Sequence, residues 1–232
     1  MFLNLRSRGD GSKDETAKME IMSADGTTVI CQNPKNKYPE NVIGAFAAVT
    51  NETTIVACGG YDGSKSTISS CYSYGGDKKW DKLADMTTPR EFSASVRIPG
   101  GIWVTGGVVD ASNVLKTTEK MFLNKTKQVG PTLPAARYGH CMVNYGDKIF
   151  STGGLDENRD ATSNVWQFDA GDNFAKSDRA VMKKTRWDHG CGIVHSIHHG
   201  SRPLLVVAGS YSGYGGTGDK TSEHWDFTLA GS

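Results

Sequence analysis

The chain has 232 residues, of which 37% are hydrophobic and 28 are glycine, and its formal net charge at neutral pH is +1. The apolar fraction is sufficient for a packed core, and the balanced charge gives no electrostatic reason to expect nucleic acid or an anionic membrane as a partner. The sequence has no apolar run near the ~20 residues of a membrane span and no signal-peptide core at its amino terminus, so we expect no membrane span.

The amino-terminal region divides into two parts. Residues 1–17 offer little for a core to bury and are expected to form a flexible segment. Arg8-Gly9-Asp10 spells the integrin tripeptide, but three common residues often recur by chance, so we interpret it as part of a polar loop. Lys18–Met22 and Thr27–Cys31 flank an Asp-Gly turn and are predicted to form a hairpin.

A short apolar strand that runs directly into a pair of glycines recurs along the chain. Its clearest copy is Gly101–Gly107, and the first glycines of the copies are Gly59, Gly106, Gly153 and Gly209. The last copy is degenerate, because Ser210 replaces the second glycine. The spacings are 47, 47 and 56 residues, and a repeat of about fifty residues is typical of propellers rather than solenoids.

Each repeat predicts a four-stranded antiparallel meander. In the copy that begins at Glu91, the predicted strands are Phe92–Ile98, Ile102–Thr105, Thr118–Leu123 and Lys127–Val129. Such a sheet has two apolar faces, so copies must stack face to face. In the last copy, three strands are predicted, at Trp187–Val194, Leu204–Ala208 and Glu223–Phe227.

The repeats resemble the kelch repeat over residues 17–228. The features in register are the glycine pair, a strand aromatic (Tyr72, Phe122, Trp166, Trp225), Trp80 in the first full copy, and an arginine that opens each following copy (Arg90, Arg137, Arg186). The resemblance implies an all-β, kelch-type β-propeller domain over 18–232. We expect a partial blade at 18–33 and blades at about 42–89, 90–136, 137–185 and 186–228, as a piece of a larger propeller.

The five cysteines bear on both fold and compartment. Cys58 ends one predicted strand and Cys71 begins the next, and opposed residues on antiparallel strands lie ~4.5–5.5 Å apart at Cα, which a disulfide accepts. The alternative is two buried thiols in a cytosolic protein. Cys141 and Cys191 occupy matching places on two neighbouring first strands, where we expect separate core thiols too distant to bond. Cys31 is left without an expected partner in the chain.

Asn51-Glu52-Thr53 and Asn124-Lys125-Thr126 are N-glycosylation sequons on predicted turns. Phrases such as Ala57-Cys58-Gly59-Gly60 also look like those of secreted invertebrate kelch proteins. This similarity favours an extracellular location, with the cytoplasm as the alternative.

The sequence offers no catalytic constellation. It has no nucleophile elbow, phosphate loop or paired carboxylates, so we expect a protein that is not an enzyme, without cofactor or metal. Four of the six histidines fall within eleven residues, at His189, His195, His198 and His199, and the stretch from His195 to Gly200 is interpreted as an extended polar loop between two strands. Some kelch-type propellers resemble galactose oxidase, and Cys71 beside Tyr72 is the one adjacency that suggests a copper-radical site. Strand neighbours point to opposite faces, so this alternative is weak.

The resemblance therefore implies a binding platform for a protein, peptide or glycan, without nucleic acid. In kelch domains that bind peptides, residues after the glycine pairs and at the starts of the first strands line one end. Here they are Tyr61, Asp62, Leu155, Asp156 and Tyr211, together with Arg90, Arg137, Tyr138, Arg186 and Trp187. The three arginines have an alternative structural interpretation, in which they hydrogen-bond carbonyls between blades. A further alternative is the cytosolic substrate-recognition domain of a ubiquitin-ligase adaptor.

Overall fold

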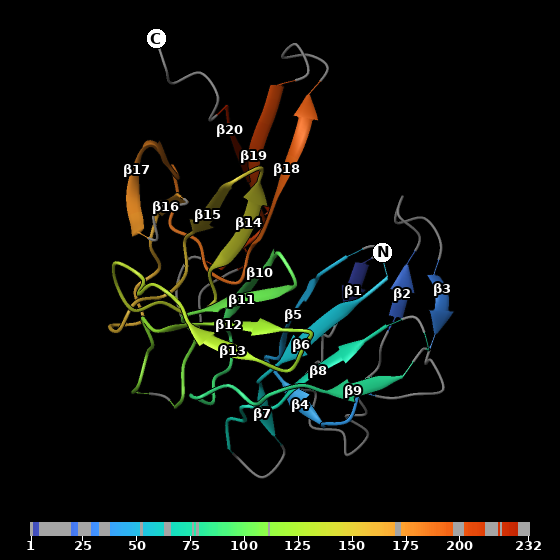
Figure 1. The fold of residues 1–232 in the computed structure, drawn as a ribbon. Coiled ribbons are helices and arrows are strands. Elements are labelled where there is room, and N and C mark those ends of the chain that lie inside the picture. The colour runs from blue at the N-terminus through green and yellow to red at the C-terminus, as the bar shows by residue number, and fades with distance from the viewer. Residues whose placement is uncertain are drawn as a thin grey trace. The chain divides into compact units, whose positions relative to one another are not determined.

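The computed structural model describes residues 2–4, 20–22, 29–32, 38–51, 53–62, 66–75, 77, 79–110, 112–169, 173–196, 202–211, 218 and 220–226. In these ranges, all regular secondary structure is β-strand (Figure 1). The chain divides into two compact units, one of Met1–Val104 with Glu119–Val129, and one of Thr105–Thr118 with Gly130–Ser232. The described part of the chain contains no helix with the length and apolar character to cross a membrane.

The first unit begins with a small three-stranded sheet. Its strands β1 (Phe2–Asn4), β2 (Glu20–Met22) and β3 (Val29–Gln32) pair antiparallel in chain order. Strands β2 and β3 correspond to the predicted hairpin, whereas β1 lies in a segment for which the sequence predicts little structure. Arg8-Gly9-Asp10 lies outside the described residues.

Two four-stranded sheets follow in the first unit. One is formed by β5 (Phe46–Val49), β6 (Ile55–Cys58), β8 (Cys71–Tyr74) and β9 (Trp80–Lys82), beside a two-stranded ladder of β4 (Val42–Ile43) and β7 (Tyr61–Asp62). The other is formed by β10 (Ala94–Ile98), β11 (Gly101–Thr105), β12 (Thr118–Phe122) and β13 (Lys127–Val129). Only Thr105 and Thr118 of these last strands are assigned to the second unit. The meander predicted for this repeat is therefore confirmed.

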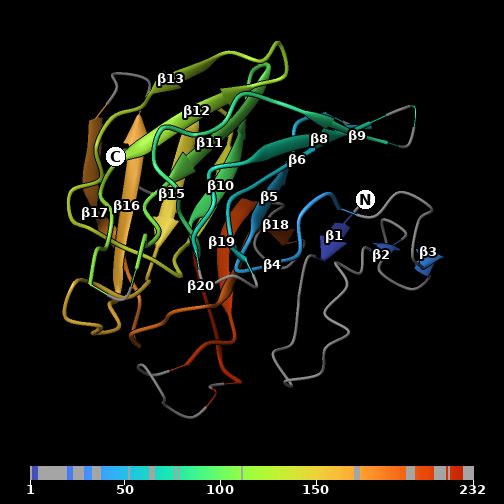
Figure 2. The same cartoon turned by 90° about the horizontal axis from the view of Figure 1, so that it is seen from below.

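The second unit contains one four-stranded and one three-stranded sheet. The first is formed by β14 (Cys141–Tyr145), β15 (Lys148–Thr152), β16 (Asn164–Asp169) and β17 (Asn173–Val181). The other is formed by β18 (Gly190–Ser196), β19 (Arg202–Ala208) and β20 (Ser222–Asp226). All neighbouring strands in both sheets are antiparallel and follow chain order, as Figures 1 and 2 show.

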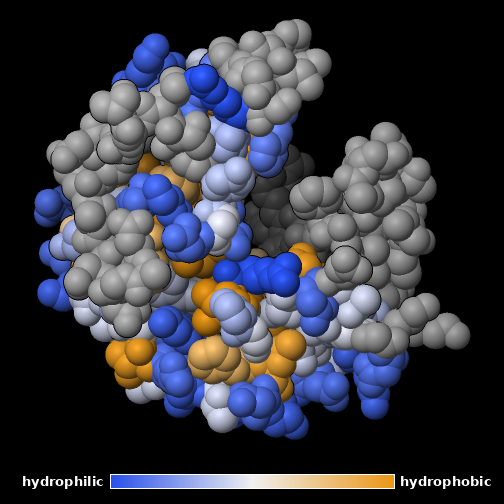
Figure 3. Space-filling model, turned by 45° about the horizontal axis from the view of Figure 1, so that its top comes forward, coloured by the Kyte–Doolittle hydropathy of each residue, from blue (hydrophilic) through white to orange (hydrophobic). Residues whose placement is uncertain are grey.

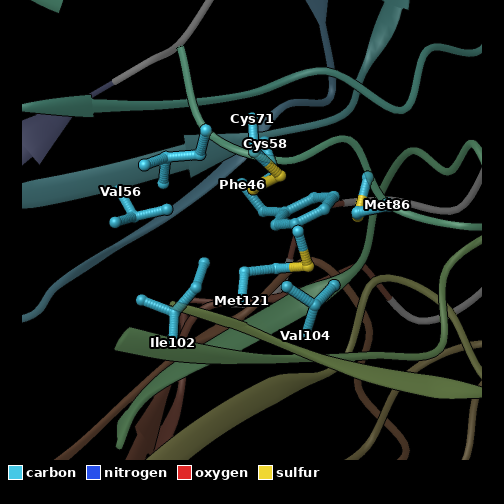
Figure 4. Close-up of a cluster of buried hydrophobic side chains, with 9 residues drawn as sticks. Phe46, Val56, Cys58, Cys71, Met86, Ile102, Val104 and Met121 are labelled. Atoms are coloured by element: carbon cyan, nitrogen blue, oxygen red, sulfur yellow. A yellow bond between two sulfur atoms is a disulfide. The ribbon is translucent and has the colours of Figure 1, made fainter. Parts of the chain in front are cut away.

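The cores lie between sheets, as the two-faced apolar strands require. Every residue of β6 and of β11 is buried, which explains why their sequences are continuous apolar runs rather than alternating ones. In the first unit, the core cluster consists of Phe46, Val56, Cys58, Cys71, Leu83, Met86, Ile102, Val104 and Met121 (Figure 4). In the second, it consists of Phe150, Val165, Met182, Leu205 and Val207. Each fully buried aliphatic side chain contributes about 1.5–3 kcal/mol through its transfer from water.

The glycine pairs bind the main chain of the arginine that opens the following repeat. The amide of Gly60 donates to the carbonyl oxygen of Arg90 at 2.9 Å, and Gly154 donates to Arg186 at 2.7 Å. A Cβ on the preceding Gly59 would lie 2.3 Å from the same Arg90 oxygen. Because both glycines also have positive φ, of 64° and 108° in this copy, no other residue type fits easily.

Two disulfides lie within the units, one in each. Cys58 and Cys71 are register partners across β6 and β8 and are bonded, with a Cα–Cα distance of 4.1 Å. Cys141 and Cys191 are also bonded, with a Cα–Cα distance of 5.9 Å. The expectation that these two are separate core thiols is wrong, because the first strands of neighbouring sheets, β14 and β18, approach within the span of a disulfide. Cys31 lies in β3.

Candidate binding surface

The candidate site is built on the edge of each sheet where the second strand ends in the glycine pair and the first strand begins. We call this the glycine-pair edge. There the residue after each glycine pair forms a backbone bridge to the start of the first strand: Tyr61 with Ile43, Leu155 with Tyr138, and Tyr211 with Trp187. Two of these bridges, Leu155 with Tyr138 and Tyr211 with Trp187, join predicted residues, whereas Ile43 was not among the predicted strand starts.

Arg90 and Arg186 are fully buried and bind carboxylates inside the protein. Arg90 Nη2 lies 2.9 Å from Glu119 Oε1, and the same carboxylate accepts the amides of Thr87 and Thr88 at 2.7 and 3.1 Å. Burial of Glu119 opposes its ionisation, but the amides and the charge of Arg90 outweigh burial and lower its pKa.

Arg186 repeats this arrangement with Glu223. Its Nη2 lies 3.0 Å from Glu223 Oε1, and the carboxylate accepts the amides of Lys183 and Lys184 at 2.6 and 3.2 Å. Arg186 Nη1 also donates to the carbonyl oxygen of Gly209 at 2.9 Å. In both repeats, one carboxylate therefore binds both the arginine side chain and the backbone amides of the segment just before that arginine.

Arg137 is held differently. Its Nη1 donates to the carbonyl oxygen of Gly153 at 2.9 Å and to the hydroxyl of Thr162, and its guanidinium lies 4.3 Å from the ring centroid of Trp166. Burial lowers the pKa of Arg137 to about 10. The contact with Trp166 is a cation–π interaction in place of an ion pair.

The backbone hydrogen bonds show why Trp166 replaces a carboxylate. The amides of Gly106, Gly153 and Gly209 bind the carbonyls of Thr117, Asn164 and Thr221, so Trp166 is equivalent to Glu119 and Glu223. By the same comparison, Pro134 is equivalent to Thr87 and Lys183. Proline has no amide hydrogen, so a carboxylate at position 166 would lose one of its donors.

The geometry therefore favours the structural interpretation of the three arginines, whose exposed fractions are 0%, 2% and 0% for Arg90, Arg137 and Arg186. Tyr138 and Leu155 are also buried, in a small cluster with Val108. These five residues position the glycine-pair edge and do not present side chains on it.

Asp62 and Asp156 close the loops that follow the glycine pairs. Asp62 Oδ1 accepts the amide of Ser66 at 3.0 Å, and Asp156 Oδ1 accepts the amides of Asn158 and Asp160 at 2.9 and 3.0 Å. Asp110 has the same role in its repeat, where it binds Ser112, and sequence analysis missed it. Hydrogen bonding within these turns explains the recurrence of aspartate at this position.

Aromatic side chains remain at the surface of this edge. Tyr61 and Trp187 are half-buried and Tyr211 is 38% exposed. The rings of Trp187 and Tyr211 lie 5.5 Å apart at their centroids. Large hydrophobic side chains exposed elsewhere in the described ranges include Val129, Val181 and Val194. On the face shown in Figure 3, apolar patches are separated by polar side chains.

Two further residues of this edge were missed by sequence analysis. Phe92 is 36% exposed with a φ of 49°, and Glu91 beside it is partly buried, which raises the pKa of its carboxyl group to about 7. The available signal was the position of Glu91 directly after Arg90, which is equivalent to that of Tyr138 after Arg137 and Trp187 after Arg186.

The described histidines do not form a metal site. His140 and His189 are buried, and their Nε2 atoms lie 2.8 Å from the hydroxyls of Thr105 and Thr152. Burial and then the neighbouring arginine charge lower their pKa values to about 3 and about 4. His195 is exposed at the end of β18, while His198 and His199 lie outside the described residues. No group of three potential metal ligands occurs in the part of the chain that the structure covers.

The Cys71–Tyr72 adjacency does not provide the cross-link that an oxidase site needs. Cys71 is bonded to Cys58 in the core, whereas the Tyr72 hydroxyl donates to Glu40 Oε1 at 2.6 Å. The two side chains leave the strand on opposite faces, and the Cys71 sulfur is already bonded.

Both sequons lie at the other edge of the sheets. Asn51 is in the turn between β5 and β6, and Asn124 is in the turn between β12 and β13, both exposed. In each, the asparagine Oδ1 accepts the threonine amide and hydroxyl, with hydroxyl distances of 3.2 Å for Thr53 and 2.7 Å for Thr126. Because β6 and β11 run away from these turns toward the glycine pairs, the sequons are remote from the glycine-pair edge of their own sheets.

Comparisons with known proteins agree with this architecture. The kelch motif family model matches residues 136–173. Kelch-like protein 38 of Homo sapiens is 25% identical over 162 residues, which are 67% of this chain and 26% of that protein's length. The solved structure of YjhT superposes with a TM-score of 0.70 at 10% sequence identity, over 89% of this chain and 72% of that one. At this identity, the structural match shows the fold alone. Residues 136–173 therefore carry a kelch motif, and the described sheets have the fold of β-propeller blades.

Proposed function

We propose that this chain is a non-catalytic binding platform for a protein, peptide or glycan. One observation carries the proposal: the recurring arginines are bound within their own sheets, while Tyr61 in the first unit and Trp187 and Tyr211 in the second remain at the surface of the glycine-pair edges of their own sheets. Loops on a rigid β-frame commonly carry recognition, and aromatic side chains are frequent anchors of interfaces. Within each unit the frame is held by a buried ion pair, Arg90 with Glu119 in the first and Arg186 with Glu223 in the second.

We propose an extracellular location for the platform. The two disulfides support it, because the cytosol keeps such thiols reduced. The exposed sequons Asn51 and Asn124 are the proposed glycan acceptors, and glycans there would leave the glycine-pair edge of the first unit's sheets uncovered.

The second candidate is a cytosolic substrate-recognition domain of a ubiquitin-ligase adaptor. The similarity to Kelch-like protein 38 favours it, although the chain spans only 26% of that protein's length. The thiol state separates the candidates, since a cytosolic protein would carry four free thiols where the extracellular one carries two disulfides.

The platform is tested by capturing partners from an extract of the source tissue under oxidising conditions. We expect Tyr211→Ala to weaken the captured interaction by about 2 kcal/mol, the scale of an aromatic anchor. Val194→Ala is the matched control, because Val194 is a 47% exposed apolar residue toward the far end of the same sheet. Equal binding by both variants would contradict a recognition role for this edge, and a parallel glycan array identifies a carbohydrate partner.

A further inference from the structure

One backbone position near the start of each first strand has a left-handed conformation. The residues there are Gly44, Phe92, Gly139 and Asp188, with φ values of 68°, 49°, 60° and 51°. They are linked within each unit, because the amide of Phe92 donates to the carbonyl of Gly44 at 3.0 Å and that of Asp188 to Gly139 at 2.7 Å. The frame thus requires this conformation, and glycine is the residue that adopts it without strain.

Phe92 is the unexpected occupant of this position. A bulky side chain in the left-handed region is a strained outlier, and such strain persists where surrounding structure or function maintains it. Phe92 is not buried to compensate, since 36% of the residue's surface is exposed. The stability of the sheet therefore does not explain the choice of phenylalanine.

The ring and the Glu91 carboxylate flank the same point above Gly44. A Cβ built on Gly44 would lie 3.3 Å from Phe92 Cε1 and 3.4 Å from Glu91 Oε2. Gly44 has no Cβ, so no side chain of its own occupies this position. The aromatic ring and the carboxylate oxygen therefore lie beside each other over the backbone of Gly44 in the first unit.

The carboxylate of Glu91 makes no hydrogen bond or ion pair with any residue that the structure describes. Its carboxylate is nevertheless partly withdrawn from water, which is unfavourable for an unpaired charge. Glu119 and Glu223, by contrast, each bind an arginine and two backbone amides. Glu91 is therefore the carboxylate of this edge with unused capacity to accept hydrogen bonds, and its raised pKa agrees with that.

We infer that Glu91 and Phe92 form a binding site for the cationic group of an arginine or lysine side chain on a protein partner. The carboxylate would accept charge-assisted hydrogen bonds, and the ring would attract the same cation through its face. An apolar ligand would leave Glu91 desolvated and unpaired, and an anion would be repelled. The inference rests on the proposed function and names the chemistry of the partner.

The first test uses small probes on the full chain. N-acetyl-arginine amide and N-acetyl-lysine amide are titrated while the ring resonances of Phe92 are followed by NMR, with N-acetyl-citrulline amide as the neutral analogue of arginine. We expect a saturable shift with one or both cations and an affinity at least about tenfold weaker for citrulline, as loss of a charged hydrogen bond implies. Equal shifts with citrulline, or no saturable shift with either cation, would overturn the inference.

The second test uses variants that separate binding from folding. Glu91→Gln is expected to weaken cation binding at least about tenfold, and Phe92→Gly to weaken it while the melting temperature stays level or rises, because backbone strain is relieved. Asp188→Gly is the matched control, since it changes the equivalent left-handed position in another sheet and should leave binding unchanged. A folded Phe92→Gly variant with undiminished affinity contradicts a ligand-facing ring.

A partner captured in the pull-down distinguishes this site from the platform itself. If the partner binds the wild-type chain and Tyr211→Ala weakens it, but Glu91→Gln does not, then the cation site is wrong while the platform stands. If wild-type chain and variants capture nothing and the array is also silent, the platform is contradicted.

Discussion

The main-chain carbonyl oxygen of Arg137 lies 2.8 Å from the amide nitrogen of Gly107 and accepts its hydrogen bond. A Cβ on the preceding Gly106 would stand 2.3 Å from the same oxygen. This relationship explains two recurring sequence features together, because the glycine pair of one repeat is in direct backbone contact with the arginine of the next. We call this contact the glycine–arginine joint.

The joint predicts that alanine at the first glycine is severely destabilising. Gly153→Ala would place Cβ 2.4 Å from the Arg186 carbonyl oxygen, in addition to a φ of 60°. Gly146→Ala is the matched control, because Gly146 has a φ of 59° but nothing within 4 Å of its Cβ position. We expect the control to lose ~1 kcal/mol and Gly153→Ala at least ~2 kcal/mol more in urea unfolding. Equal losses would show that the close approach is easily relaxed.

The buried ion pairs predict a strong effect of neutralising one partner. Glu119→Gln keeps the side-chain shape but leaves the guanidinium of the fully buried Arg90 without its counter-charge, so unfolding free energy should fall by ~3–5 kcal/mol. Glu157→Gln, at an exposed position in the second unit, is expected to change little. Chemical denaturation of both variants measures this, and similar midpoints would contradict a structural role for the pair.

Stability should decline on acidification below pH 6.5. The folded pKa values of His140 and His189 are about 3 and about 4, so in the window around pH 5.5 the unfolded chain binds about two more protons than the folded one. Glu91 acts oppositely, because its folded pKa of about 7 makes the folded chain bind one more proton in that window. One net proton gives a slope of about 1.4 kcal/mol per pH unit. Glu91→Gln should steepen the slope, and His189→Gln should flatten it.

Peptide mapping without reductant should yield two cross-linked pairs, Cys58 with Cys71 and Cys141 with Cys191. The loops they close are 13 and 50 residues long. In the chain-entropy model, removal of the shorter one costs ~3 kcal/mol and removal of the longer one ~4 kcal/mol. Serine substitutions at Cys71 and Cys191 measure these losses. Four free thiols in protein from an oxidising compartment would remove the main support for an extracellular location.

Glycosidase treatment of protein made through a secretory route should convert Asn51 and Asn124 to aspartate, each with the loss of one glycan. Thr53→Ala and Thr126→Ala should each abolish one site, because the hydroxyl that donates to the asparagine oxygen is lost. Thr53→Ser is the matched control, since it keeps both the hydroxyl and the sequon. Unmodified asparagine at both positions in the wild-type chain contradicts the proposed acceptors.

The sequence by itself determined the repeat, the four-stranded meander of residues 92–129 and the antiparallel pairing inside it. Strands of a meander pair with their chain neighbours, and the glycine pair marks where the second strand must end, so the register that opposes Cys58 to Cys71 followed from local spacing. The recurrence of Arg90, Arg137 and Arg186 was also visible, although two roles remained open for them.

Only the tertiary structure decided the contacts between repeats. A separation of fifty residues says nothing about the 5.9 Å between Cys141 and Cys191, because that distance depends on how closely two first strands approach. The cation–π contact between the Arg137 guanidinium and the Trp166 ring was likewise visible only in the tertiary structure, because nothing in the sequence paired these two residues. The strained backbone of Phe92 and the desolvated carboxylate of Glu91 were also decided only by the tertiary structure. Residue type and spacing predict neither a local backbone conformation nor the burial of a side chain.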